Sequence, residues 1–255
     1  MIYRIRGTNV YLIGTIHLVP NGAILPIGPQ RLIVEQAAEV VFESDLDHPP
    51  VPDCHVLENG SLSDLLGRDL FERVRFLAES AGFEQPLDRL KPWYVGMMLG
   101  IHLPLSSGAT LVGVDRQLWD HAIACGKAKF VLEGVEFFRA VDQAPVAETV
   151  AALDYLASNP NEPTKQLDAI FQAWRRADLK ALDTAFALTA RMMPTIYRVL
   201  FRDRNRMWIG SLLKAIQLQR RCAFVVGCGH IAHGDYSLEK LLHGNGYLLE
   251  ASETT

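Results

Sequence analysis

The chain has 255 residues, of which 49% are hydrophobic and 21% are charged, and its formal net charge is −4. This length and composition suffice for one sizeable core, or for a core with an inserted subdomain. The weakly acidic balance argues against nucleic acid and anionic membranes as partners. No apolar run approaches the about 20 residues that a bilayer requires, so we predict no transmembrane segment.

The first residues and the cysteines bear on the compartment. Ile2–Ile5 already has the pattern of a strand, and no basic leader precedes an apolar stretch, so we expect no cleaved signal peptide. The cysteines lack zinc-ribbon spacing and are too few for a disulfide framework, which favours a reducing, cytoplasmic environment. Cys228 lies in a candidate site motif but is interpreted as a small buried residue, because no neighbour that would lower its pKa is evident. The four cysteines are Cys54, Cys125, Cys222 and Cys228.

In chain order, the amino-terminal half alternates between strand and helix patterns. It begins with a hairpin over residues 2–13, a Pro/Gly-rich loop over 19–28, a helix over 29–38, a strand over 40–42 and a loop over 47–52. Helices follow over 61–66, 69–81 and 91–102, then a strand over 109–114, a helix over 117–124 and a strand over 129–132. Strands that alternate with helices predict a parallel sheet.

The carboxyl-terminal half is mostly helical. Residues 144–189 read as helical hairpins broken at Asn159-Pro160 and Glu162-Pro163, and 195–219 as one long amphipathic helix. We therefore predict a single domain over residues 1–255 with a helical subdomain at about 144–219, which could serve as a lid, a homodimer surface or plain packing. A strand over 222–226, a short helix over 236–242 capped by Asp235 and a final strand over 246–249 complete the chain.

Two short segments far apart in the chain resemble each other. Gly14-Thr15-Ile16-His17 and Gly227-Cys228-Gly229-His230 each follow an apolar, strand-like run. A glycine that permits close backbone approach, followed by a histidine where the strand ends, is a way for an α/β sheet to present an imidazole to a crevice. The pair predicts one site that the fold assembles from both ends of the chain.

Carboxylates occupy similar places at the ends of predicted strands. Glu43 follows three apolar residues, where an unpaired carboxylate would be costly to bury, so we place it in the site. Asp115 and Glu133 are equally compatible with a place in the site and with ordinary ion pairing. Because parallel strands point their carboxyl ends to one edge, these acids and the two histidines are expected to meet there. Imidazole with carboxylate is a standard ligand set for a divalent transition metal.

Arg204 lies within the charged run Arg202–Arg206 of the long predicted helix. Such a run is usually a solvated face. Helical spacing nevertheless places Leu200, Arg204, Met207 and Ser211 on one face, and Leu200 and Met207 should point inward. A guanidinium on that face could hold a carboxylate or a developing oxyanion.

The remaining polar candidates are weaker. His233 follows His230 by three residues and is the next candidate ligand, while Asn205 has no assigned role. The other histidines are interpreted as surface or packing residues: His48, His55, His102, His121 and His243.

Several blocks of the sequence together resemble the TraB/GumN family, which also includes the Tiki proteins and the pheromone-shutdown proteins. The blocks are "VYLIGTIHLVP", "VVFESDLD", "LKPW", "GVDRQL", "GKAKFVLE", "RDRNRMW" and "FVVGCGHIAHGDYSLEKLLHGNGY", in the family's order. The resemblance implies an α/β fold with a split, mostly parallel sheet, related to the erythromycin esterase and ChaN-like proteins, with a large helical insertion. For the Tiki branch it implies a protease that depends on a divalent metal.

The matching positions lead to a specific hypothesis. His17, Glu43 and His230 are expected to hold a divalent ion, Mn, Co or Zn, with Glu43 or Glu133 as the general base and Arg204 as the oxyanion donor. The expected activity is hydrolysis of an amide or ester bond, with a peptide as the favoured substrate. The main alternative is a binding protein that holds haem, a metal, a small molecule or a peptide without turnover. A degenerate structural homologue is the third option.

Overall fold

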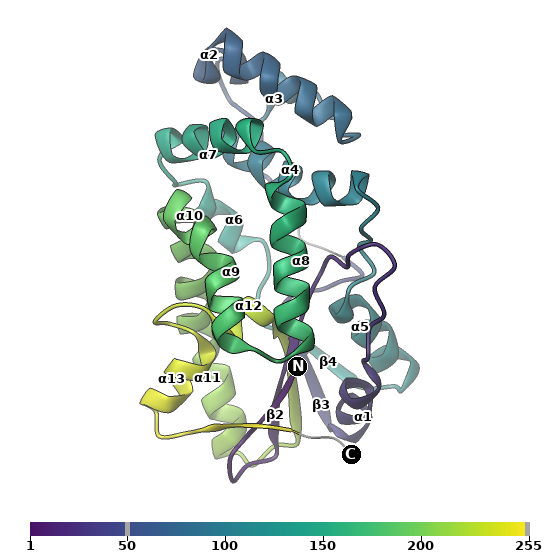
Figure 1. The fold of residues 1–255 in the computed structure, drawn as a ribbon. Helices are drawn as coiled ribbons and strands as arrows, with labels where there is room; N and C mark the ends of the chain where they lie inside the picture. The colour runs from purple at the N-terminus through teal and green to yellow at the C-terminus, as the bar shows by residue number, and fades with distance from the viewer. Residues whose placement is uncertain (49–51, 253–255) are drawn as a thin grey trace.

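The computed structural model describes residues 1–48 and 52–252, and its centre is a mixed β-sheet (Figure 1). Within these residues the sheet has six strands in the order β4-β3-β5-β2-β1-β6. The strands β2, β3, β4 and β5 run parallel, and the amino-terminal hairpin adds β1 antiparallel to β2. The bounds are Ile2–Ile5 (β1), Val10–Thr15 (β2), Glu39–Phe42 (β3), Ala128–Val131 (β4), Cys222–Gly227 (β5) and Leu249–Ala251 (β6). The predicted α/β fold with a mostly parallel sheet and a helical insertion is confirmed.

The strand β5 is central because apolar side chains cover it on both faces. Five of its six residues are buried, as expected of an interior parallel strand. Its neighbours are β2, with Leu12 opposite Phe224, and β3, with Val41 opposite Phe224. Segments from residues 10–15, 39–42 and 222–227 therefore end side by side.

Helices cover both sides of the sheet (Figure 1). Helices α1 and α5 pack against each other on one side, where the ring of Trp119 lies 4.8 Å from that of Phe42. Helices α11, α12 and α13 lie on the other side. Helix α8 reaches the end of β2, where Trp174 Nε1 donates a hydrogen bond of 2.7 Å to the carbonyl oxygen of Gly14.

The helices have the following bounds: Gly28–Gln36 (α1), Leu62–Leu66 (α2), Arg68–Ser80 (α3), Pro92–Ser106 (α4), Val114–Ala124 (α5), Glu136–Val141 (α6), Val146–Ser158 (α7), Glu162–Arg175 (α8), Leu179–Met192 (α9), Pro194–Tyr197 (α10), Arg204–Gln217 (α11), Cys228–Ala232 (α12) and Leu238–Gly244 (α13). A π-helical segment, Arg198–Asp203, joins α10 to α11. No helix among the described residues is both long enough and apolar enough for a membrane crossing.

Among the described residues, buried apolar side chains form two clusters. One surrounds the sheet and includes Phe171, Trp174 and Trp208 from α8 and α11. The other lies among α2, α3, α4, α6, α7 and α10, away from the sheet (Figure 1). The predicted helical subdomain at about 144–219 stays a prediction, and buried side chains of that stretch contribute to both clusters.

The predicted strand over 109–114 is wrong. Thr110 forms an isolated antiparallel bridge with Val19, whereas Leu111 and Val112 are exposed. Helix α5 already begins at Val114, whose amide donates to the carbonyl oxygen of Ile16. The apolar run has no neighbouring strand to pair with, so Asp115 lies in the first turn of a helix instead of at the end of a strand.

Other boundaries also differ from the prediction. Glu162-Pro163 opens α8 instead of breaking a helix, because proline is tolerated in a first turn. Ser237, not Asp235, caps α13, since its hydroxyl accepts from the amide of Lys240. The last strand begins at Leu249, later than predicted. The loop expected over 47–52 lies partly outside the described residues.

Candidate active site at the carboxyl edge of the sheet

The order of the strands gathers the predicted site residues at one edge. Glu43 directly follows β3, and its amide donates to the carbonyl oxygen of Val225 in β5 (3.1 Å). His17 lies two residues after β2, and His230 lies in α12, which begins as soon as β5 ends. Glu133 lies two residues after β4. The structure thus brings the predicted residues of four strands together.

Gly227 lies at the centre of the three predicted metal ligands. A Cβ atom built on it would lie 3.4 Å from Glu43 Oε2, 3.5 Å from His230 Cδ2 and 3.6 Å from His17 Nε2. Its amide donates a hydrogen bond of 2.9 Å to Glu43 Oε2. A side chain at position 227 would therefore fill the space that these three groups border.

Asn205 fixes the orientation of His230. Its amide nitrogen donates to the carbonyl oxygens of His230 (3.0 Å) and Tyr236 (2.9 Å), so its Oδ1 must be an acceptor. That oxygen lies 2.7 Å from Nδ1 of His230, which therefore carries the proton. The lone pair of the neutral ring is then on Nε2, toward Glu43.

Asp115 has the same relation to His17. Its Oδ2 lies 2.7 Å from Nδ1 of His17, which leaves Nε2 directed toward Gly227. An imidazole whose Nδ1 is bound to an oxygen and whose Nε2 is bare is the arrangement of histidine ligands in metal sites. Both histidines of the site have the oxygen at Nδ1, but Nε2 of His230 lies 3.2 Å from Arg204 Nη1, and Nε2 of His17 is protonated at neutral pH because Asp115 raises the pKa of that ring to about 9.

Arg204 lies between the acidic groups. Its Nη2 donates to Oε1 of Glu43 and Oε1 of Glu133, both at 2.5 Å, and its Nε donates to Oε2 of Glu133 at 2.8 Å. Its Nη1 lies 3.2 Å from Nε2 of His230. The guanidinium is flanked by the rings of Phe137 and Trp208, and it is buried, not part of a solvated face.

The environment sets the protonation of the two carboxylates. Burial alone would raise the pKa of Glu43, but the positive charge of Arg204, with smaller effects of the histidines, holds that pKa far below its usual range. Burial raises the pKa of Glu133, and the guanidinium only partly opposes this. Two carboxylates that share one arginine thus differ in their affinity for a proton.

The two histidines also differ. Burial lowers the pKa of His230 to about 3, so the ring is neutral at physiological pH. The charge of Asp115 raises the pKa of His17. The side chain of His17 is 57% exposed, whereas that of His230 is 5% exposed. The site therefore opens to solvent on the side of His17.

The predicted ligands are not tightly clustered. In the described part of the chain, one group of three His, Cys, Asp or Glu side chains has ligand atoms within 4.8 Å of one another, and it lies elsewhere. Arg204 Nη1 and Nη2 engage His230 Nε2 and Glu43 Oε1. An ion at the site would share these atoms with the guanidinium or displace it.

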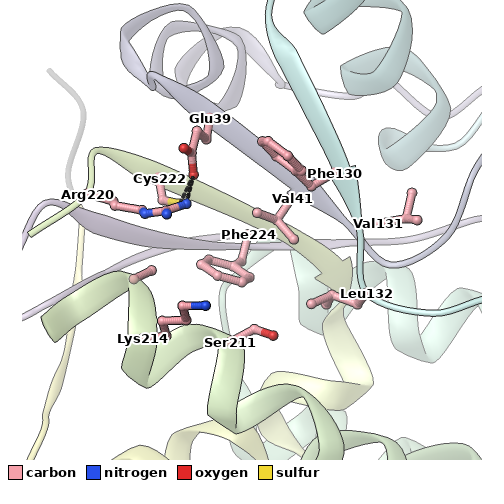
Figure 2. Close-up of a pocket in the computed structure, with 11 residues that line it drawn as sticks. Glu39, Val41, Phe130, Val131, Leu132, Ser211, Lys214, Arg220, Cys222 and Phe224 are labelled. Carbon is pink, nitrogen blue, oxygen red and sulfur yellow. Dashed lines mark hydrogen bonds and ion pairs between the residues drawn. The ribbon is translucent and has the colours of Figure 1, made fainter. Parts of the chain in front are cut away.

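A groove on the sheet lies apart from these residues. It lies between β3, β4, β5 and α11 (Figure 2). Its volume is about 190 Å³. Arg220 Nη1 and Glu39 Oε2 pair across one end of it at 2.7 Å. None of the predicted site residues lines it, so the groove is separate from the candidate site.

The sequence matches the model of the TraB/PrgY/gumN family over residues 2–251, nearly the whole chain. The chain belongs to the TraB/PrgY/gumN family. No significant match was found among curated proteins or among solved structures. Membership of the TraB/PrgY/gumN family confirms the resemblance found in the sequence blocks.

Sequence reasoning left two positioning residues of this TraB/PrgY/gumN chain without a role. Asn205 is fully buried and fixes His230, and its only sequence signal was its place beside Arg204. Asp115 holds His17. His233 is buried and pairs with Asp183, which removes it from the group around Gly227.

Proposed function

We propose that this protein is a metal-dependent hydrolase of amide or ester bonds, with a peptide as the favoured substrate. His17, Glu43 and His230 would hold the divalent ion, Mn, Co or Zn. The observation that carries the proposal is the pair of imidazoles around Gly227, each with Nδ1 bound to an oxygen and Nε2 directed inward. A hydrogen-bonded Nδ1 is a feature of histidine ligands in metal sites, and its partners here are the buried amide of Asn205 and the mostly buried carboxylate of Asp115.

The charge of the site supports a cation. With His230 neutral and His17 protonated, because the pKa of His17 is raised to about 9, the carboxylates of Glu43, Glu133 and Asp115 exceed the cations Arg204 and His17 by one negative charge. Once a metal ion has displaced the His17 proton, the excess is two. This excess negative charge is costly in free energy, because the edge of the sheet is partly desolvated. A divalent ion would neutralise it.

Each residue has a distinct task in this proposal. A divalent ion supplies Lewis acidity and makes water a better nucleophile near neutral pH. Glu133 is the favoured general base, because burial raises its pKa toward the working range while that of Glu43 is lowered. Arg204 holds both carboxylates in place, and it would stabilise an oxyanion by exchanging one of its present acceptors, such as His230 Nε2, for the substrate oxygen.

A second candidate function is a binding protein that holds haem, a metal or a peptide without turnover. The hydrogen bonds from Arg204 to Glu43 Oε1 and His230 Nε2 favour it, because these atoms already have a partner. A ligand recognised by the exposed edge of His17 would leave that network intact.

Metal content and turnover decide between the two functions. Purified protein would be stripped with chelator, reloaded with Mn²⁺, Co²⁺ or Zn²⁺, assayed for metal by elemental analysis and screened against a peptide library. We expect turnover that requires metal, and loss of turnover together with one bound ion per chain in His17→Ala and His230→Ala. His243→Ala, in α13, is the matched control and should behave as wild type. Full metal occupancy in both site variants would refute the proposal, and a Soret band after haem addition without any turnover would favour the binding protein.

A further inference from the structure

Three side chains with different ligand atoms meet on the side of the sheet covered by α1 and α5. They are Glu35 near the end of α1, His121 in the last turn of α5 and Cys125, which follows α5. His121 Nε2 lies 3.0 Å from Glu35 Oε1 and 3.7 Å from Cys125 Sγ. One ligand atom of each residue lies within 4.8 Å of the other two.

The two separations from His121 Nε2 are close to those between neighbouring ligand atoms of a tetrahedral metal site. Bond lengths of about 2.0 Å to nitrogen and oxygen and about 2.3 Å to sulfur place neighbouring ligand atoms about 3.3–3.6 Å apart. The observed separations of 3.0 and 3.7 Å differ from these by a few tenths of an ångström. A cation could therefore replace the proton between His121 and Glu35 with small side-chain movements.

The backbone already holds these three residues in register. His121 lies in α5, and Cys125 is the residue that caps its carboxyl end. Because they are four positions apart, both side chains lie on the same face of the helix. The ammonium group of Lys127 donates to the carbonyl oxygens of Glu35 and Ala37, which ties the end of α1 to the segment after α5. Pre-organised ligands lose less conformational entropy when an ion binds.

We propose that Glu35, His121 and Cys125 form a second metal site, which binds a thiophilic divalent cation such as Zn²⁺ and clamps α1 to α5. Sulfur, imidazole and carboxylate together favour zinc or cobalt over magnesium and calcium. Three protein ligands leave one position for water. On binding, the thiol proton is released and the imidazole proton is carried on Nδ1, so that sulfur and Nε2 both donate lone pairs.

This site is separate from the candidate active site. Asp115 and His121 both belong to α5 but lie six residues apart, about 9 Å along the helix axis. The ligand set at the sheet edge contains oxygen and nitrogen atoms only. A thiolate signal therefore reports on the second site alone.

Cobalt binding tests the proposal. Full-length protein, stripped of metal and kept reduced, would be titrated with Co²⁺ while the thiolate-to-cobalt charge-transfer absorbance in the near ultraviolet is recorded. We expect a band that saturates at one Co²⁺ per chain, with an intensity that corresponds to one thiolate ligand. The band should be lost in Cys125→Ser. Cys54→Ser is the matched control and should keep the band, since Cys54 lies elsewhere, packed against the helical cluster. The double variant His17→Ala, His230→Ala should also keep it, which separates this site from the proposed function.

Zinc affinity gives a second, independent measurement. Competition with a chromophoric chelator should show that Cys125→Ser and Glu35→Gln both weaken zinc binding. Cys125→Ser should weaken it by more than about 100-fold, which exceeds the effect of replacing a residue that only hydrogen-bonds to a metal ligand. Zn²⁺ should raise the Tm of wild type and leave that of Cys125→Ser unchanged. A band that persists in Cys125→Ser, or no band in folded wild type, would overturn the proposal.

Discussion

Asp115 Oδ2 lies 2.7 Å from Nδ1 of His17, and this contact joins the first turn of α5 to the end of β2. The carboxylate orients the ring and makes Nε2 a stronger donor. We predict that Asp115→Asn, which preserves an acceptor but removes the charge, weakens metal binding at the sheet edge by about 10–100-fold. Isothermal titration with Mn²⁺ or Zn²⁺ in a Cys125→Ser background would measure it.

Asp120→Asn is the control for this substitution. Asp120 lies on the same helix and pairs with Arg116 at the surface, so its loss should leave metal affinity unchanged. Equal affinities of Asp115→Asn and Asp120→Asn would show that the contact with His17 has no part in metal binding.

Arg204 is the cation between Glu43 and Glu133, and its removal should be costly. Arg204→Ala leaves two buried carboxylates facing each other, so we predict a loss of about 3–5 kcal/mol in the free energy of unfolding, measured with urea. Arg202→Ala is the control, because Arg202 pairs with the partly exposed Asp203, and its cost should stay below about 1 kcal/mol.

A second substitution separates the structural role of Arg204 from its proposed catalytic role. Adding Glu133→Gln to Arg204→Ala replaces one buried charge by a neutral amide and should recover part of the stability. Turnover should stay about 100-fold or more below that of Glu133→Gln alone, which lacks the proposed base but keeps the oxyanion donor. Equal turnover of the double variant and Glu133→Gln would assign Arg204 a structural role alone.

The sequence predicts those residues of the site whose position is determined by the end of a strand. Apolar runs that end at Gly14 and Gly227, and the buried run before Glu43, mark parallel strands whose carboxyl ends must share an edge. His17 and His230 follow directly from that rule. The pairing order itself, with β5 between β2 and β3, is a long-range choice that local periodicity does not encode.

The predicted helix faces failed for a geometric reason. Arg204 was expected to share an inward face with Met207, yet Met207 is 58% exposed while Asn205 and Trp208 are buried. Arg204 and Met207 both lie in α11, whose buried face includes Arg204, Asn205, Trp208 and Leu212, and Met207 lies outside that arc. The π-helical segment Arg198–Asp203 ends before Arg204 and shifts only the relation of Leu200 to this face. The amino-acid composition of Arg198–Asp203 does not indicate a π-helical turn.

Stability at alkaline pH should depend on Cys222. Burial raises the pKa of its thiol from 9.0 to about 11, and the nearby carboxylate of Glu39 acts in the same direction. Between these two values the unfolded chain has lost the proton that the folded chain keeps, so stability falls as the pH rises from 9 to 11. We predict that in Cys222→Ala this fall is smaller by about 2–3 kcal/mol, measured by urea unfolding at a series of pH values.

Cys125→Ser is the matched control for the alkaline measurement, because Cys125 is exposed. Its stability should decline between pH 9 and 11 as that of wild type does. The same decline in Cys222→Ala would show that the buried thiol does not titrate with the expected pKa.

Substitution by alanine at two glycines near the site should affect the stability of the fold very differently. At Gly113 a Cβ atom would lie 2.3 Å from the carbonyl oxygen of Ile16 and 2.4 Å from that of His17, so backbone must move. We predict that Gly113→Ala lowers the free energy of unfolding by more than about 2 kcal/mol. At Gly227 the same atom meets Glu43, His230 and His17 at 3.4–3.6 Å, which is ordinary contact.

Gly227→Ala should therefore fold with a stability within about 1 kcal/mol of wild type, since φ at this position is −53° and suits alanine. Its methyl group would nevertheless fill the space bordered by the three proposed ligands, so metal retention and turnover should fall by at least about tenfold. Urea unfolding and elemental analysis on the same preparations give both numbers. A stable Gly227→Ala variant with full metal content and wild-type turnover would mean that the metal ion does not bind in the space between Gly227 and the three proposed ligands.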